Sequence, residues 1–274
     1  MMTKRKITAL LIACLAPVFL LGASDYMKYI ELADEAVAKQ DWDRAEELLR
    51  AAMQSEPSNP QNVMLLSNVG MFQFYRGEDS LALHTLSEAR AIAPASTVIL
   101  NNRANVLRHI GREEDALKDY GKVIEMDSVN YDAYFNRGYI RFTRGDSIGA
   151  RADFDMLEKI RPDSPNTMMA LAVLYSNQGN YSEAISYYNR LISKVQKAEY
   201  YTGRAMCRLA KGDLAEASDD IGRGLELDPA DGELYFCRAY LHLLQYREEE
   251  ARADAELAMR YGVAKERIDD LFSR

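Results

Sequence analysis

A spacing of 34 residues recurs along almost the whole chain and limits what the chain can fold into. Alanines separated by 34, 34, 34, 33 and 34 residues stand at Ala82, Ala116, Ala150, Ala184, Ala217 and Ala251, and a weaker first copy contains Ala45. A glycine lies five residues before most of these alanines, and a proline often follows twelve residues after them. Self-similarity at this period is typical of stacked helical hairpins, none of which buries its apolar face alone. The sequence therefore predicts an all-α solenoid and not a globular enzyme domain.

The fourth copy shows how each unit is expected to be built. Apolar residues at helical spacing predict a first helix over residues 131–143 and a second over about residues 148–160. Gly145 lies between them and supplies the left-handed conformation that commonly ends a helix. Pro162 ends the second helix, because proline cannot continue the hydrogen-bond ladder. Each copy is thus expected to be a helix, a tight turn and a second helix.

The copies resemble the tetratricopeptide repeat over about residues 26–261. Counted from the first residue of the family's repeat, the units begin at residues 26, 63, 97, 131, 165, 198 and 232. The family's small eighth residue appears as Ala33, Gly70, Ala104, Gly138, Ala172, Ala205 and Ala239, whereas its tryptophan is missing. The resemblance implies a right-handed α–α superhelix of about seven helix hairpins. A last amphipathic helix, residues 264–272, is expected to cap it.

The first residues of the chain are not part of the repeats. A basic head, an apolar run over residues 7–21 and small residues up to Ser24 predict a signal peptide over residues 1–24, cleaved near Ser24. The mature solenoid, residues 25–274, is then expected to be periplasmic or secreted. Two alternatives stay open: an uncleaved membrane anchor, and a lipoprotein attached through Cys14, where the sequence resembles a bacterial lipobox.

Charge narrows the class of partner. Removing residues 1–24 takes away three basic and no acidic side chains, leaving 31 Lys and Arg against 42 Asp and Glu, a net charge of −11. This charge repels nucleic acid and acidic lipid, so no nucleic-acid partner and no membrane insertion after signal cleavage are expected. A protein or peptide partner is expected, and self-association is a further option.

No motif for catalysis or cofactor binding is found in the sequence. The three histidines are scattered, and no metal-ligand spacing or nucleophile motif occurs. We therefore expect a protein that is not an enzyme and needs no cofactor or metal. Cys207 and Cys237 remain after signal cleavage and are expected to be small buried residues, with a disulfide between them left open.

Covariation among the repeats predicts an ion pair between the two helices of a hairpin. Place 7 is arginine in four copies (Arg103, Arg137, Arg204 and Arg238), and place 23 is aspartate in the same four (Asp119, Asp153, Asp220 and Asp254). Where place 7 is apolar, place 23 is not acidic. We expect partly buried, bidentate Arg–Asp pairs. Inherited similarity among recent duplicates is the alternative explanation.

Asparagines on the first helices form the first candidate site. In the family these helices line a concave face, along which an extended peptide commonly lies. Place 6 is asparagine in three successive repeats, at Asn68, Asn102 and Asn136, and Asn101 and Asn105 add polar capacity beside the middle one. A carboxamide offers both a donor and an acceptor to a peptide backbone. The alternative is that such asparagines are common in the family whatever the ligand.

Aromatic side chains form the second candidate site. Those expected to face the groove are Phe74, Phe135, Tyr139, Phe142, Phe236 and Tyr240, unless they belong to the core between repeats. The basic residues of a chaperone-tail carboxylate clamp are replaced by Asn101, Asn166 and Ala170, so that specificity is not expected. The sequence predicts a scaffold that binds an extended segment or a helix of a partner in its concave groove. The alternative is a structural or assembly subunit of an envelope complex that acts through its convex face or its ends.

Overall fold

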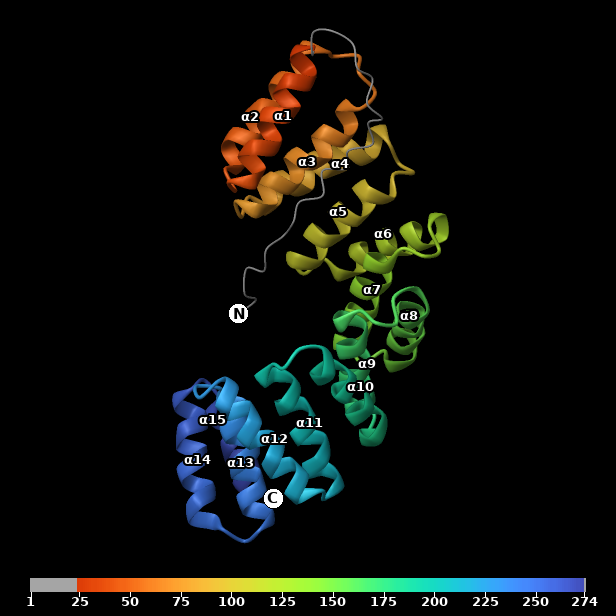
Figure 1. The fold of residues 1–274 in the computed structure, drawn as a ribbon. Coiled ribbons are helices and arrows are strands. Elements are labelled where there is room, and N and C mark those ends of the chain that lie inside the picture. Colours follow the sequence, from red (N-terminus) through yellow and green to blue (C-terminus); the bar gives the residue numbers. More distant parts are fainter. Residues whose placement is uncertain (1–23, 274) are drawn as a thin grey trace. The chain divides into compact units, whose positions relative to one another are not determined.

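The computed structural model describes residues 24–273, and all regular elements in this range are helices (Figure 1). They are α1 (Asp25–Ala38), α2 (Trp42–Ser55), α3 (Asn62–Tyr75), α4 (Asp79–Ile92), α5 (Thr97–His109), α6 (Glu113–Met126), α7 (Tyr131–Thr143), α8 (Ser147–Ile160), α9 (Pro165–Asn177), α10 (Tyr181–Lys194), α11 (Ala198–Lys211), α12 (Leu214–Leu227), α13 (Gly232–Leu244), α14 (Glu248–Arg260) and α15 (Lys265–Phe272). The all-α fold expected from the sequence is confirmed. None of these helices combines the length and apolarity that a membrane span requires.

The chain divides into two compact units, with the boundary inside α7 after Arg137. Within the first unit α1 packs on α2, α3 on α4 and α5 on α6. Within the second unit α9 packs on α10, α11 on α12 and α13 on α14. The predicted signal peptide lies outside the described residues, apart from Ser24, which precedes α1.

Turns between paired helices follow the glycine pattern of the sequence. Gly145 has a φ of +79°, and the glycines at the same place in other repeats also have positive φ values, as at Gly77, Gly111, Gly179 and Gly212. Helix α8 begins one residue earlier than expected, because the Asp146 carboxylate caps it by accepting a 2.9 Å hydrogen bond from the Gly149 amide. The first and last repeats place Gln40 and Tyr246 in the left-handed region instead. For non-glycine residues this costs about 1 kcal/mol each.

Small residues allow the two helices of a hairpin to approach closely. Every alanine at place 20 is fully buried, as are the alanines at place 8. Where place 8 is glycine, no side chain fits: a Cβ on Gly138 would lie 2.5 Å from Cε1 of Phe154. The large residue at place 24 fills the remaining volume, and its members Leu49, Leu86, Tyr120, Phe154, Tyr188 and Ile221 are buried. The 34-residue period of the sequence therefore reflects the same helix–helix packing repeated in each hairpin.

Three of the four predicted Arg–Asp pairs are confirmed as bidentate contacts, namely Arg103–Asp119, Arg204–Asp220 and Arg238–Asp254. In the first, the Arg103 Nε donates to Asp119 Oδ2 at 2.7 Å and its Nη2 donates to Oδ1 at 2.8 Å. The Asp119 side chain is only 2% exposed, so the pair is shielded from water. Arg137 and Asp153 fall in different units, and their pair stays a prediction.

A second partner for these aspartates was missed in the sequence. Place 11 carries a basic residue in three repeats, and each contacts the aspartate at place 23, in the pairs Arg141–Asp153, Arg208–Asp220 and His242–Asp254. In the second repeat, places 11 and 23 are joined by the Gln73–Thr85 hydrogen bond, and in the fifth by the Tyr175–Tyr187 ring stack. The signal was present as a recurring basic residue one helical turn after the arginine at place 7.

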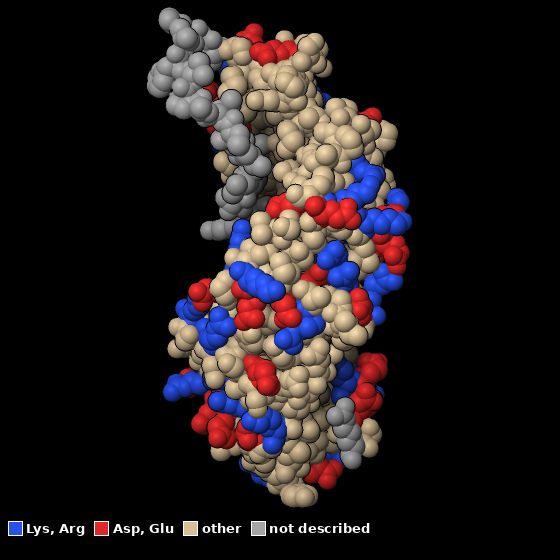
Figure 2. All heavy atoms as spheres, turned by 90° about the vertical axis from the view of Figure 1, so that its right-hand side faces the viewer, with Lys and Arg blue, Asp and Glu red and all other residues tan. Residues whose placement is uncertain are grey.

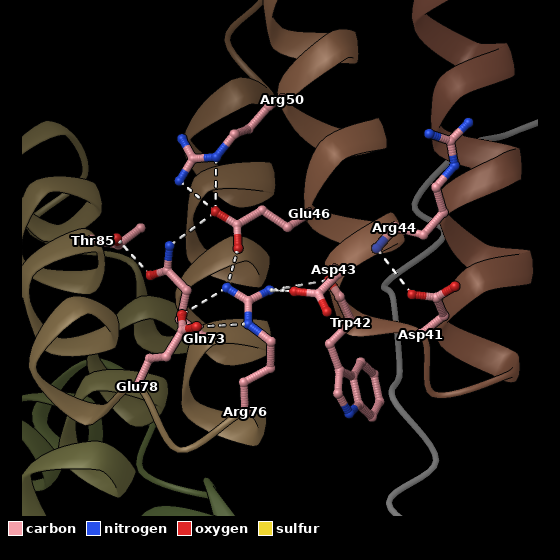
Figure 3. A network of polar contacts seen from close by, with 10 residues as sticks. All are labelled: Asp41, Trp42, Asp43, Arg44, Glu46, Arg50, Gln73, Arg76, Glu78 and Thr85. Atoms are coloured by element: carbon pink, nitrogen blue, oxygen red, sulfur yellow. Dashed lines mark hydrogen bonds and ion pairs between the residues drawn. The ribbon is translucent and has the colours of Figure 1, made fainter.

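The first two repeats lack the Arg–Asp pair and use a network centred on Glu46 (Figure 3). Arg76 Nη2 donates to Glu46 at 2.6 Å, Gln73 Nε2 donates at 3.0 Å, and Arg50 also donates. Gln73 in turn accepts from the Thr85 hydroxyl at 2.8 Å. Burial by itself raises the pKa of Glu46, but these hydrogen bonds outweigh burial and hold it below its usual value. The network therefore links α2, α3 and α4 through one ionised carboxylate.

On the face drawn in Figure 2, basic side chains lie among acidic ones. Many such neighbours form exposed pairs one helical turn apart, such as Arg151–Asp155 and Arg223–Glu226. Exposed pairs of this kind contribute little to stability. The buried aspartates at place 23 are thus the ion pairs that matter for folding.

Helix α15 covers the end of the last hairpin. Its Ile268 and Leu271 are buried against Phe236, Ala255 and other residues of α13 and α14. Arg267 lies over the ring of Phe236 with 4.7 Å between its guanidinium carbon and the ring centroid, and also pairs with Glu233. The hairpin of α13 and α14 thereby buries an apolar face against α15.

We expect strong coupling between Arg103 and Asp119. Arg103→Met or Asp119→Ala alone should destabilise the chain by about 3 kcal/mol, because each leaves a buried charge unpaired, whereas the double variant should lose less than the sum. Urea unfolding followed by circular dichroism measures this. Asp115→Ala, which removes an exposed carboxylate from the same helix α6, is the control and should have a much smaller effect. Additive losses would contradict a buried pair.

Titration of His242 should make stability depend on pH. Burial, followed by the positive charge of Arg247, lowers the pKa of His242, although Asp254 lies 3.3 Å away. The unfolded chain then binds this proton more readily, so stability is complete above about pH 6.5 and falls as pH drops through and below that value. Thermal melts from pH 7.5 to 5.5 should show a smaller decline for His242→Gln than for wild type. The exposed His84→Gln is the control; equal declines in all three proteins would disprove the assignment.

Candidate functional site

A groove of about 630 Å³ in the first unit is lined by residues of the first helices α3, α5 and α7 and of the loop before α7. One wall is apolar and is formed by Met71, Phe74 and Tyr75 of α3. The rings of Phe74 and Tyr75 lie 5.9 Å apart, and Trp42 of α2 supports Tyr75 from behind at 5.0 Å. His109 of α5 meets Phe74 edge-on at 5.0 Å. This wall offers a preformed aromatic contact surface.

The middle of the groove is polar and is formed by two carboxamides of α5. Asn101 donates to Asn130 Oδ1 at 3.1 Å, and its own Oδ1 is buried with no hydrogen-bond partner among the described residues. Asn105 Oδ1 accepts a 2.6 Å hydrogen bond from the Tyr120 hydroxyl. The Nδ2 of Asn105 has no hydrogen-bond partner among the described residues. Residues four apart lie on one face of a helix. One free acceptor and one free donor therefore stand side by side.

The asparagines at place 6 are not equivalent. Asn102 and Asn136 line the groove, but each amide nitrogen is already bound, to Ser67 Oγ at 3.1 Å and to the Asp132 carbonyl at 2.9 Å respectively. Asn68 is not among the lining residues. The side-chain oxygens of Asn102 and Asn136 and one N–H of each amide remain for a ligand, whereas Asn101 and Asn105 offer a whole unbound atom each.

The guanidinium of Arg108, which was not predicted as a site residue, also lines the groove. Arg108, in the last turn of α5, interacts with the Tyr120 hydroxyl, and its Nε is buried without an acceptor. Burial raises the pKa of Tyr120, and the positive charge of Arg108 opposes that rise only in part, so the hydroxyl stays a donor to Asn105. The signal was available: the other repeats carry Val37, Phe74, Phe142, Ser176, Leu209 and Leu243 at this place.

The predicted aromatic residues are divided between the two units. Phe135 stacks on Tyr131 with centroids 6.3 Å apart in the first unit. Tyr139, 49% exposed, and Phe142 belong to the second unit. Phe236 is only 9% exposed and is a core residue beneath α15, where it and Tyr240 line a small pocket of about 230 Å³. Of the six, only Phe74 lines the groove of the first unit.

Hydrogen bonding and apolar contact are the chemistry that this groove offers. Within residues 24–273, no group of three or more His, Cys, Asp or Glu side chains could hold a metal ion. Cys207 and Cys237 are free and buried, and burial raises the pKa of both thiols. These thiols are therefore packing residues of the second unit.

The repeats identify the family. The family model for the tetratricopeptide repeat matches residues 30–97, 101–165 and 169–231, which is more than half of the chain. The chain therefore belongs to the tetratricopeptide repeat family, whose members are non-catalytic modules for protein–protein interaction.

Solved structures and curated relatives agree with this. A tetratricopeptide repeat protein from Parabacteroides merdae ATCC 43184 is 32% identical, with a TM-score of 0.68 over 92% of this chain and 98% of that one. YrrB, described as a TPR protein with an unusual peptide-binding site, is 18% identical, with a TM-score of 0.56 over 69% of this chain and 98% of its own, and shows the fold alone. The co-chaperone DNJ1 of Fusarium oxysporum f. sp. lycopersici, which contains tetratricopeptide repeats and a J domain, is 26% identical over 57% of this chain. The matched part spans 32% of that relative.

Removing the Tyr120 hydroxyl should destabilise the groove. Tyr120→Phe leaves the buried Asn105 oxygen without its donor, at an expected cost of about 1–3 kcal/mol. Tyr188→Phe is a matched control, because Tyr188 occupies place 24 of another repeat and its hydroxyl has no hydrogen-bond partner among the described residues. Thermal unfolding midpoints measure both. Equal, small effects would show that the Tyr120 hydroxyl does not position Asn105.

Proposed function

We propose that this protein is an interaction module that binds an extended peptide segment of a partner protein in the groove of its first unit. One observation carries the proposal: the unpartnered Asn101 oxygen and Asn105 nitrogen lie on one face of α5 beside an apolar wall. A buried polar atom without a partner costs free energy that a ligand can recover.

An extended backbone suits this arrangement. Its residues expose N–H and C=O groups that no internal hydrogen bond satisfies, and a carboxamide pair can accept from the first and donate to the second. A bulky apolar side chain of the same peptide would then lie on the wall of Met71, Phe74 and Tyr75. Backbone contacts fix the conformation of the peptide, whereas the wall selects its side chain.

We propose that the protein acts outside the cytoplasm. The basic head and apolar run of residues 1–24 support export. A mature chain with a net charge of −11 disfavours nucleic acid as the partner and leaves protein segments as the ligands that fit. A peptide site described for YrrB, a protein of the same fold, supports this class of ligand.

A defined peptide library tests the proposal. Random dodecapeptides with free C-termini are selected on the immobilised full chain, and the affinities of individual peptides are then measured by fluorescence anisotropy. Asn101→Ala with Asn105→Ala should weaken binding roughly tenfold, since each lost hydrogen bond is worth about 0.5–1.5 kcal/mol.

The matched control is Asn166→Ala, which removes an exposed carboxamide from α9 in the second unit. It should bind peptides as the wild-type chain does. Circular dichroism confirms that each variant is folded. Absence of any selected peptide, or equal affinity in the double variant and the control, would refute the proposal.

A further inference from the structure

Arg108 is a half-buried cation in the groove that the fold does not neutralise. It forms no ion pair with a carboxylate of the described residues, and its one recorded partner is the neutral hydroxyl of Tyr120. Its Nε is buried with no acceptor among residues 24–273. Burying an unpaired charge is costly, so such a group calls for an explanation.

Two other half-buried arginines of the first unit set a contrast. Arg103 is 15% exposed and forms a bidentate pair with Asp119. Arg76 is 17% exposed and contacts three carboxylates. Both of these arginines have carboxylate partners within the chain. The groove contains one carboxylate among the described residues, that of Asp132, and it does not pair with Arg108.

The helix end explains only part of this placement. Arg108 and His109 lie in the last turn of α5, where a positive charge favours the negative end of the helix dipole. That interaction is satisfied by a cation pointing into solvent and does not require the side chain to line a groove with an unpaired Nε. A ligand group is the missing acceptor.

We infer that the peptide bound in this groove presents a carboxylate to Arg108, next to a bulky apolar side chain on the wall of Met71, Phe74 and Tyr75. This inference rests on the proposed peptide-binding function. Guanidinium and carboxylate pair through two parallel hydrogen bonds, which add direction as well as energy. The carboxylate is that of an Asp or Glu side chain or of the peptide's C-terminus.

Asp132 also lines the groove and carries a negative charge. It lies in the first turn of α7, is exposed, and makes no ion pair with Arg108. Arg108 lies in the last turn of α5. Both charges act on the Tyr120 hydroxyl in opposite directions, so Asp132 is a nearby negative charge that leaves Arg108 without an ion pair among the described residues.

Peptides selected on the full chain are resynthesised in three forms: unchanged, with every Asp and Glu replaced by Asn and Gln, and with an amidated C-terminus. Affinities are measured by fluorescence anisotropy for the wild-type chain and for Arg108→Met, Arg108→Lys and Arg90→Met. Arg90 is a matched control, because it is also a half-buried arginine without a carboxylate partner but does not line this groove.

We expect one of the two neutralised forms to bind wild type at least tenfold more weakly, and which form does so identifies the source of the carboxylate. Arg108→Met should bind the unchanged peptide more weakly by the same factor. Neutralising the peptide should not weaken its binding to this variant any further. Arg108→Lys should keep most of the preference for the carboxylate-bearing peptide over its neutralised form. Arg90→Met should keep this preference in full. The preference should also weaken as salt is raised, because charged groups at a groove are screened.

Two results separate the failure of this inference from failure of the proposed function. If peptides bind in a manner that depends on Asn101 and Asn105, but neutralisation and Arg108→Met change nothing, the carboxylate is absent and peptide binding stands. If no selected peptide depends on Asn101, Asn105 or Arg108, both are wrong. Circular dichroism and melting midpoints of Arg108→Met distinguish lost binding from lost folding, and Arg108→Lys covers the case in which the methionine variant is unstable.

Discussion

The buried aspartate at place 23 is the interaction on which the middle and last hairpins depend. Asp220 accepts both bonds of Arg204 and a further contact from Arg208, although its side chain is only 2% exposed. A carboxylate buried to this degree is tolerated only when several donors satisfy its oxygens. Because the donors come from the first helix and the acceptor from the second, the pair fixes the register of the two helices. The small residues at places 8 and 20 then determine how closely they approach.

The first two repeats use other side chains for the polar contacts that link their helices. Place 23 is Thr85 in the second repeat, where Gln73 takes the position of the second cation and passes the contact on to Glu46 of the preceding hairpin. The polar link thus runs between repeats as well as within one. Repeats of this kind are stabilised by their own hairpin and by the interface to the next. In the first two repeats this polar interface adds to the apolar contacts between neighbouring hairpins.

Much of the fold could be predicted from the sequence because packing recurs at a fixed period. The helix over residues 131–143, the turn at Gly145 and the Arg103–Asp119 pair all depend on residues that repeat. The candidate site could not be predicted in the same way. Asn102 and Asn136 share a place in the repeat, yet one binds Ser67 and the other its own helix. Which side-chain atoms stay free depends on neighbours that are not periodic, so spacing alone could not show which carboxamides are already hydrogen-bonded.

Departures from the repeat are therefore where function is to be sought in such a chain. At place 12, Arg108 stands where most other repeats have an apolar or aromatic residue. At place 24, the hydroxyl of Tyr120 donates to Asn105, whereas Tyr188 at the same place of another repeat has no such contact among the described residues. Both changes leave the hairpin packing intact, since Tyr120 is fully buried. Together they orient Asn105 and place one positive charge in the groove. The periodic residues build a rigid support, and a few non-periodic side chains on α5 give one groove a chemical character of its own.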